Sequence, residues 1–208
     1  MWRAEVRASG ELVTGVVRFF MTAGSEPRPR LLPEKSFPSY AYLPGRQPHP
    51  VRDPAGHSYR IEPMATGGEP SLGSDVFRWG IDLFNHGYYW EAHEAWEALW
   101  QAANRSTPHR LLFKGLILLA AAGVKIREGK SAAAARHAKR AATLFRLVMR
   151  SPDRSFHTAL GMPPSLLAEH AEAAATSSAV LPPTMTGQAE PVFGFLLGHG
   201  QQRPPPGL

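Results

Sequence analysis

The chain has 208 residues, 43% of them apolar, which is enough for one domain with a core but not for two large domains. No stretch reaches the roughly 18 consecutive uncharged apolar residues of a membrane-spanning helix, so we expect a soluble protein without a membrane partner. The absence of cysteine excludes disulfides, a thiolate nucleophile and cysteine-ligated metal, and it is compatible with a cytoplasmic location. The formal net charge is +6.

Residues 1–35 match neither a signal peptide nor a helix, because basic and acidic residues interrupt every apolar run in the first thirty positions. We expect this segment to be disordered or to precede the true start of the protein. Met21 is then the alternative first residue.

Proline positions divide the rest of the chain. Ten of the 20 prolines lie between Pro27 and Pro70, nine follow from Pro152 onward, and Pro108 is the single one within 71–151. Because proline interrupts helices, the middle of the chain is predicted to be helical. The predicted parts are a proline-rich arm packing on the bundle (36–70), a helical domain (71–176) and a flexible tail (177–208).

Capping signals define the predicted helices in chain order. The predicted N-caps are Ser74, Thr107, which precedes an N1 proline, and Ser131, and the predicted left-handed helix ends are Gly87 and Gly129. We therefore predict an all-α fold, a compact orthogonal or antiparallel bundle of four to five helices. The predicted helices span 74–86, 88–102, 108–128 and 131–150, with a weaker fifth after Pro163 and Pro164.

The third predicted helix is apolar on nearly all sides from Leu111 to Val124, which predicts that its neighbours surround it. The tail from Ala189 onward is expected to be disordered, apart from a docking contact by Phe193 and Phe195.

Charge is polarised along the helical domain. Residues 71–104 carry a net charge of −4 and residues 105–151 a net charge of +10. One interpretation is a solvated basic face that complements the acidic helices. The other is an anion-binding stripe on the fourth helix, although no aromatic residue lies among its bases to stack on nucleobases. The anion-binding candidates are Arg136, Lys139 and Arg140.

The most informative segment runs from Phe84 to Trp100 and reads FNHGYYWEAHEAWEALW. Together with RLLFKGLILLAAA, from Arg110 to Ala122, it resembles the DUF309 family of small all-helical proteins. The resemblance extends over about 36–150, including the arm. It implies a fold and no reaction, because it brings no activity with it. Leu118 departs from the pattern, which has glutamine after Gly-Leu-Ile.

Trp90 projects from the polar side of the second helix, so a covering segment is predicted. The aromatic arm, over 37–59, is the expected cover, and it would close a pocket. This closure would bring four side chains of the arm toward Glu94 and Glu97. They are His49, Arg52, Asp53 and His57.

His93 and Glu97 are four residues apart, so both can face one ion, with His57 or His49 as a third ligand. The pattern is neither that of zinc proteases nor that of di-iron bundles. The alternative is a hydrogen-bonded structural pair, with Arg110 bridging to Glu94 or Glu97. If the protein is an enzyme, Glu94 or Glu97 is the expected general base and His93 a ligand or proton donor.

Three classes of function follow. We favour an interaction or scaffold module with a polarised surface. The alternatives are a small enzyme or metal-binding protein using His93, Glu94 and Glu97, and a binder of RNA or another polyanion through the fourth helix. The sequence assigns no cofactor, and it leaves the partner, an acidic protein or a polyanion, and the oligomeric state open.

Overall fold

The computed structural model describes residues 28–61, 70–176 and 187–199. Within these ranges the protein is all-helical and contains no β-strand, as predicted. The proposed alternative start at Met21 lies outside the described residues. The helices are α1 (Asp75–Asn85), α2 (Tyr89–Ala102), α3 (Pro108–Arg127), α4 (Ser131–Val148), α5 (Ser155–Leu160) and α6 (Pro164–Thr176).

The helices begin close to the predicted capping residues. The Ser74 hydroxyl accepts a hydrogen bond from the Phe77 amide at 3.2 Å, and the Thr107 hydroxyl accepts one from the Arg110 amide at 3.4 Å. Ser131 differs from its prediction, because it is the first residue of α4 and Lys130 occupies the N-cap position without a side-chain bond.

The turn between α1 and α2 depends on Gly87, which has a φ of +88°. The Gly87 amide donates to the Phe84 carbonyl at 3.1 Å, and the Tyr88 amide donates to the Leu83 carbonyl at 2.9 Å. This is the Schellman arrangement, which satisfies the last carbonyls of α1 and reverses the chain into α2.

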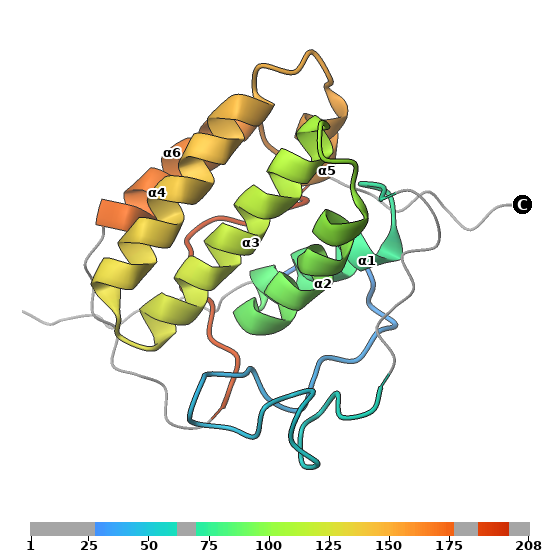
Figure 1. Cartoon of the computed structure of the whole chain (residues 1–208), viewed down its shortest axis with the longest axis vertical. Coiled ribbons are helices and arrows are strands. Elements are labelled where there is room, and N and C mark those ends of the chain that lie inside the picture. Colours follow the sequence, from blue (N-terminus) through green and yellow to red (C-terminus); the bar gives the residue numbers. More distant parts are fainter. Residues whose placement is uncertain (1–27, 62–69, 177–186, 200–208) are drawn as a thin grey trace, which may run out of the picture.

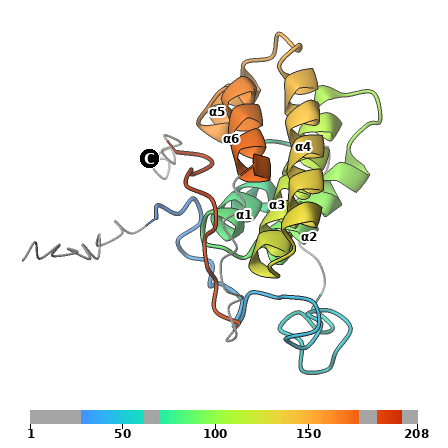
Figure 2. The ribbon, with the colours of Figure 1, turned by 90° about the vertical axis from the view of Figure 1, so that its left-hand side faces the viewer.

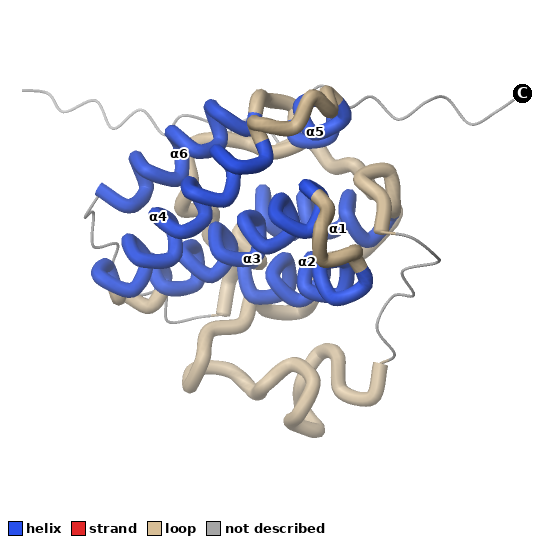
Figure 3. The backbone as a smooth tube through the Cα atoms, turned by 45° about the horizontal axis from the view of Figure 1, so that its top comes forward, coloured by secondary structure: helices blue, strands red, loops and turns tan. Residues whose placement is uncertain are grey.

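Helix α3 lies at the centre of the bundle, between α2 and α4, and α6 packs against α4 (Figure 1). The helices form one compact body when the tube is viewed from above, with the non-helical arm beneath them (Figure 3). The prediction that α3 is surrounded is confirmed, since most of its residues are buried. The largest fully buried side chains include Trp96, Phe77, Phe113 and Phe145.

The structure contains one short helix, α5, that the sequence analysis did not predict. It lies between Pro152 and Pro163 and ends at Gly161, whose φ is +71°. Its six residues are too few for apolar periodicity to show. The fifth predicted helix corresponds to α6.

Residues 187–199, which we call the C-terminal strap, differ from the predicted disordered tail. The strap runs beside the bundle (Figure 2) and stacks Phe193 on Phe84 with ring centroids 5.1 Å apart. Phe195 packs against the same ring at 6.0 Å, so both expected docking contacts are present. Burial of Phe193 and Leu197 removes apolar surface from water and explains the order of this segment.

Two segments before α1 also pack on the helices. Residues 28–35, expected to be disordered, bury Leu32 against the core. The described part of the arm, residues 36–61, buries Tyr42 and Leu43 and stacks Phe37 on Tyr88 at 4.9 Å. None of the helices in the described ranges combines the length and apolar character needed to cross a lipid bilayer.

Candidate functional site

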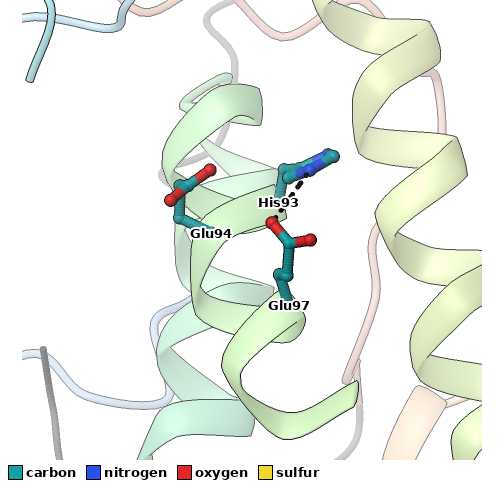
Figure 4. Close-up of side chains that lie close together, drawn as sticks. All are labelled: His93, Glu94 and Glu97. Atoms are coloured by element: carbon teal, nitrogen blue, oxygen red, sulfur yellow. Dashed lines mark ion pairs between the residues drawn. The ribbon is translucent and has the colours of Figure 1, made fainter. Parts of the chain in front are cut away.

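Three potential ligand side chains of α2 lie close together, namely the half-buried His93 and Glu97 and the exposed Glu94. One nitrogen or oxygen atom from each lies within 4.8 Å of the others. Figure 4 shows His93 and Glu97 joined one helical turn apart, with the His93 Nε2 atom 3.6 Å from the Glu97 Oε2 atom. Glu94 follows His93 directly in the chain and completes the cluster. The site is therefore built by a single helix.

The environment of His93 favours the neutral imidazole. Burial lowers its pKa most. Glu97 and a hydrogen bond with the Ile117 backbone raise the pKa, and Lys114 and His137 lower it further. A neutral imidazole keeps a nitrogen lone pair free for a metal or a proton. His93 therefore fits the role of ligand better than that of a charged partner for Glu97.

Glu94 lies among like charges. Burial raises its pKa first, and the carboxylates of Glu97 and Glu91 raise it further. Arg52 of the arm opposes this shift by lowering the pKa. The concentration of negative charge makes the cluster attractive to a cation, because a bound positive ion would relieve the repulsion between carboxylates.

The arm lies over Trp90, as the sequence analysis expected. The ring of Tyr42 packs edge-on against Trp90 at 5.1 Å, and the ring of His49 does so at 5.4 Å. These contacts shield a large apolar side chain that would otherwise project into water. His49 is thereby engaged with Trp90, and its Nδ1 atom accepts from the Val51 and Arg52 amides at 3.3 Å each.

The predicted approach of His57 and Asp53 to Glu94 and Glu97 is not what the structure shows. The His57 Nε2 atom lies 3.2 Å from the Glu91 Oε1 atom, and both side chains are almost fully buried. Asp53 closes a turn within the arm, where its carboxylate accepts from the Ala55 amide at 2.9 Å. The arm therefore packs on α2 at Trp90 and Glu91, and the expected approach to the predicted site is supported for Arg52, whose charge acts on Glu94.

Arg110 also has different partners from those predicted. Its guanidinium donates to the carbonyl oxygens of Trp100 and Ala103, the latter at 2.8 Å, and lies 4.3 Å from the centre of the Trp100 ring. The end of α2 carries unsatisfied carbonyls and partial negative charge, so a cation there is stabilising. Arg110 thus caps α2 at its C-terminal end and does not bridge to Glu94 or Glu97.

Four buried polar side chains were missed by the sequence analysis, and each ties a non-helical segment to the bundle. The Asp82 carboxylate accepts from the Leu31 and Leu32 amides at 2.7 and 2.9 Å. Asn85 exchanges two hydrogen bonds with the Leu197 backbone, at 2.8 and 2.9 Å. The other two are Glu91, which also accepts from the Tyr42 amide at 2.9 Å, and Arg127, which donates to the Gly87 and Gln188 carbonyls.

A signal for Glu91 was present in the sequence. On the helical wheel of α2 the buried arc has two edges, with His93 at one edge and Glu91 at the other. A carboxylate at the edge of a buried arc requires donors, and only a segment outside the helix could supply them. The arm supplies both the Tyr42 amide and the His57 ring.

The three anion-binding candidates of α4 all project to solvent. Arg136, Lys139 and Arg140 are exposed and lie on the other side of α3 from the acidic α2 (Figure 1). The basic residues of α4 are therefore separated in space from the acidic α2, whereas Arg110 and Lys114 of α3 lie beside α2, each 4.3 Å from the centre of the Trp100 ring.

Comparison with known proteins yields one match. Residues 77–137 match the model of DUF309, a domain of unknown function, which supports the resemblance predicted from the sequence. The match is narrower than 36–150, omits the arm, and includes most of α1 and all of α2 and α3. No curated protein and no solved structure matches the chain significantly. The segment from Phe77 to His137, which carries His93, Glu94 and Glu97, is thus similar to the DUF309 domain.

Proposed function

We propose that the protein binds a divalent transition-metal ion through His93, Glu94 and Glu97. The observation that carries this proposal is the gathering of three potential ligand atoms within 4.8 Å of one another on α2, with Glu94 exposed and the other two side chains half-buried. Ligand atoms around a zinc ion are about 3–3.6 Å apart, so rotations of the side chains would close the set. One imidazole and two carboxylates are donors that zinc, iron(II) and manganese(II) all accept.

The charges of the site support the same proposal. His93 favours the neutral form that binds metal, and Glu94 stands beside two further carboxylates. Three protein ligands leave at least one coordination position for water or substrate, as in catalytic metal sites. An ion held by these three ligands would lower the pKa of a water bound at the open position.

The test is a titration of the purified full-length chain with Co²⁺, followed by visible absorption and calorimetry. We expect one equivalent to bind, and His93→Gln and Glu97→Gln to weaken binding at least tenfold. Glu169→Gln, at an exposed position on α6, is the matched control and keeps wild-type affinity. Circular dichroism of each variant checks the fold. Absence of binding, or equal affinity in all four proteins, would refute the proposal.

A second candidate function is that of an interaction module. The exposed basic residues of α4, on the far side of α3 from the acidic α2, favour it. Its surface is α4 and is independent of the metal ligands. A pull-down with acidic and basic polymers tests it: retention on an acidic polymer that salt abolishes supports the module, and no retention overturns it.

We also propose a cytoplasmic location, which the absence of cysteine supports because disulfide-free chains suit a reducing compartment. Cell fractionation with an antibody to the native chain tests it, and recovery in an extracytoplasmic fraction would contradict it.

A further inference from the structure

The exposed side of α4 and its C-terminal end carry basic side chains that have no ion-pair partner within the described parts of the chain. They are Arg136, Lys139, Arg140 and Arg150. We call this set the basic stripe. Most other basic groups near it are engaged: Arg146 pairs with Glu172 of α6, and Lys125 and Lys130 both pair with Glu128. The stripe is thus a concentration of uncompensated charge.

The positive charges of the stripe act on the neighbouring side chain of His137. His137, on the flank of α4, has a pKa lowered by burial and then by Arg140, Lys125 and Arg136. No described acidic group offsets these charges at His137. An anion on the stripe would therefore gain from several cations together.

The shape of the stripe matches an extended anion. From Arg136 to the end of α4 at Val148 the helix rises about 18 Å, and Arg150 lies in the turn just beyond, so the stripe is about 20 Å long. A nucleic-acid duplex presents one negative charge for about every 1.7 Å of its axis, so several phosphates fall within that span. Ala132 and Ala133 precede the stripe, and their short side chains leave room for an anion to approach its N-terminal end.

The residue types of the stripe favour a nucleic-acid duplex over unpaired nucleic acid and over an acidic protein. No aromatic residue lies on it, so it offers no ring on which unpaired bases could stack. Leu147 and Met149 are the exposed large apolar side chains over the length of the stripe, and neither is aromatic, whereas protein interfaces are enriched in aromatic anchors. The surface suits a charged backbone with its bases turned inward better than it suits an acidic protein.

We infer that the basic stripe of α4 binds the phosphate backbone of double-stranded nucleic acid, without reading sequence. This inference rests on the proposed role as an interaction module and makes its partner specific. Arginine side chains suit phosphate recognition because the guanidinium can donate two parallel hydrogen bonds. Binding of this kind would depend steeply on salt, because each phosphate contact releases counterions.

The experiment measures fluorescence anisotropy of a labelled 20-base-pair duplex with the full-length protein between 50 and 200 mM salt. With about four phosphate contacts, we expect log K to fall against log salt with a slope of about −3.6. Arg136→Ala/Arg140→Ala should reduce the magnitude of this slope by about 2. The control Arg105→Ala/Arg154→Ala removes the same charge from exposed positions outside the stripe and should keep the wild-type slope.

Three outcomes overturn the inference. If both double variants reduce the salt slope equally, overall charge, and not the stripe, attracts the duplex. Binding of labelled polyglutamate but not of the duplex, with the polyglutamate released by Arg136→Ala/Arg140→Ala, would keep the interaction module and reject nucleic acid. Failure to bind either polymer would reject the module as well.

Discussion

The His57 ring and the Glu91 carboxylate lie 3.2 Å apart in the buried junction between the arm and α2. Glu91 also accepts from the Tyr42 amide, so one side chain holds two points of the arm that lie fifteen residues apart. The irregular arm is thus anchored by a polar contact as well as by its apolar side chains.

Glu91→Ala should lower the free energy of unfolding by about 2–5 kcal/mol, because it leaves the Tyr42 amide and the His57 ring buried without their acceptor. Urea denaturation measures the change. Glu169→Ala, exposed on α6, should alter stability by less than about 0.5 kcal/mol. Similar values for the two variants would argue against an anchoring role for Glu91.

Gly87→Ala should be more destabilising than Gly129→Ala. Both glycines have left-handed backbone, with φ of +88° and +72°, so both variants share the conformational cost. A Cβ at Gly87 would lie 2.5 Å from the Glu190 backbone of the strap, whereas one at Gly129 would meet nothing within 4 Å. We expect a difference of about 1–3 kcal/mol in thermal or urea unfolding. Equal costs would mean that the strap is not packed against the turn.

Asn85→Ala should release the C-terminal strap. It removes both hydrogen bonds to Leu197, and we expect a loss of about 1–3 kcal/mol and faster hydrogen exchange of the Leu197 amide. The exposed substitution Gln101→Ala serves as control. If the Leu197 amide exchanges at the wild-type rate in Asn85→Ala, the strap does not depend on this contact.

Acidification should destabilise the protein through His93. Its pKa in the folded state is lowered below the ordinary value of 6.5, so the unfolded chain binds the proton more readily. The contribution of His93 to the free energy of unfolding is therefore fully present above pH 6.5. It is lost as the pH decreases from there through the folded-state pKa. Glu94 has the opposite effect. Because its pKa is raised in the folded state, its contribution to stability increases as the pH falls to values just above 4.5.

The pH effect is measured as the midpoint of urea unfolding between pH 5 and 8. His93→Gln should flatten the decline below pH 6.5, while His157→Gln, at an exposed position on α5, should leave it as in the wild type. An unchanged slope in His93→Gln would show that His93 does not contribute to it.

The helical fold was predictable because its signals are local. Ser74, Gly87 and Thr107 each act on backbone groups within four residues, and apolar periodicity identifies α3 as central. Helix α5 was missed because six residues between prolines carry too little periodicity. The strap was expected to be disordered because its order depends on Phe84 and Asn85, more than 100 positions away in the chain.

The candidate site was predictable within one helix and not beyond it. His93, Glu94 and Glu97 come together because helical geometry fixes their relative positions. The partners of His57 and Arg110 depend on where the arm and the end of α2 lie, which spacing within the sequence does not encode. Glu91 was passed over because its importance follows from donors of the arm, and only the folded chain brings these to it.

The way the strap and the arm close the bundle also limits how the protein can be divided. The Ala41 amide donates to the Gly187 carbonyl at 2.8 Å, so segments from opposite ends of the chain are directly bonded to each other. A recombinant fragment confined to the stretch that matches the family model would lack both of them, as well as most of α4 and all of α6. Such a fragment would present Phe84 to water and leave Glu91 without its donors, so the smallest autonomous folding unit extends well past the borders of the family match.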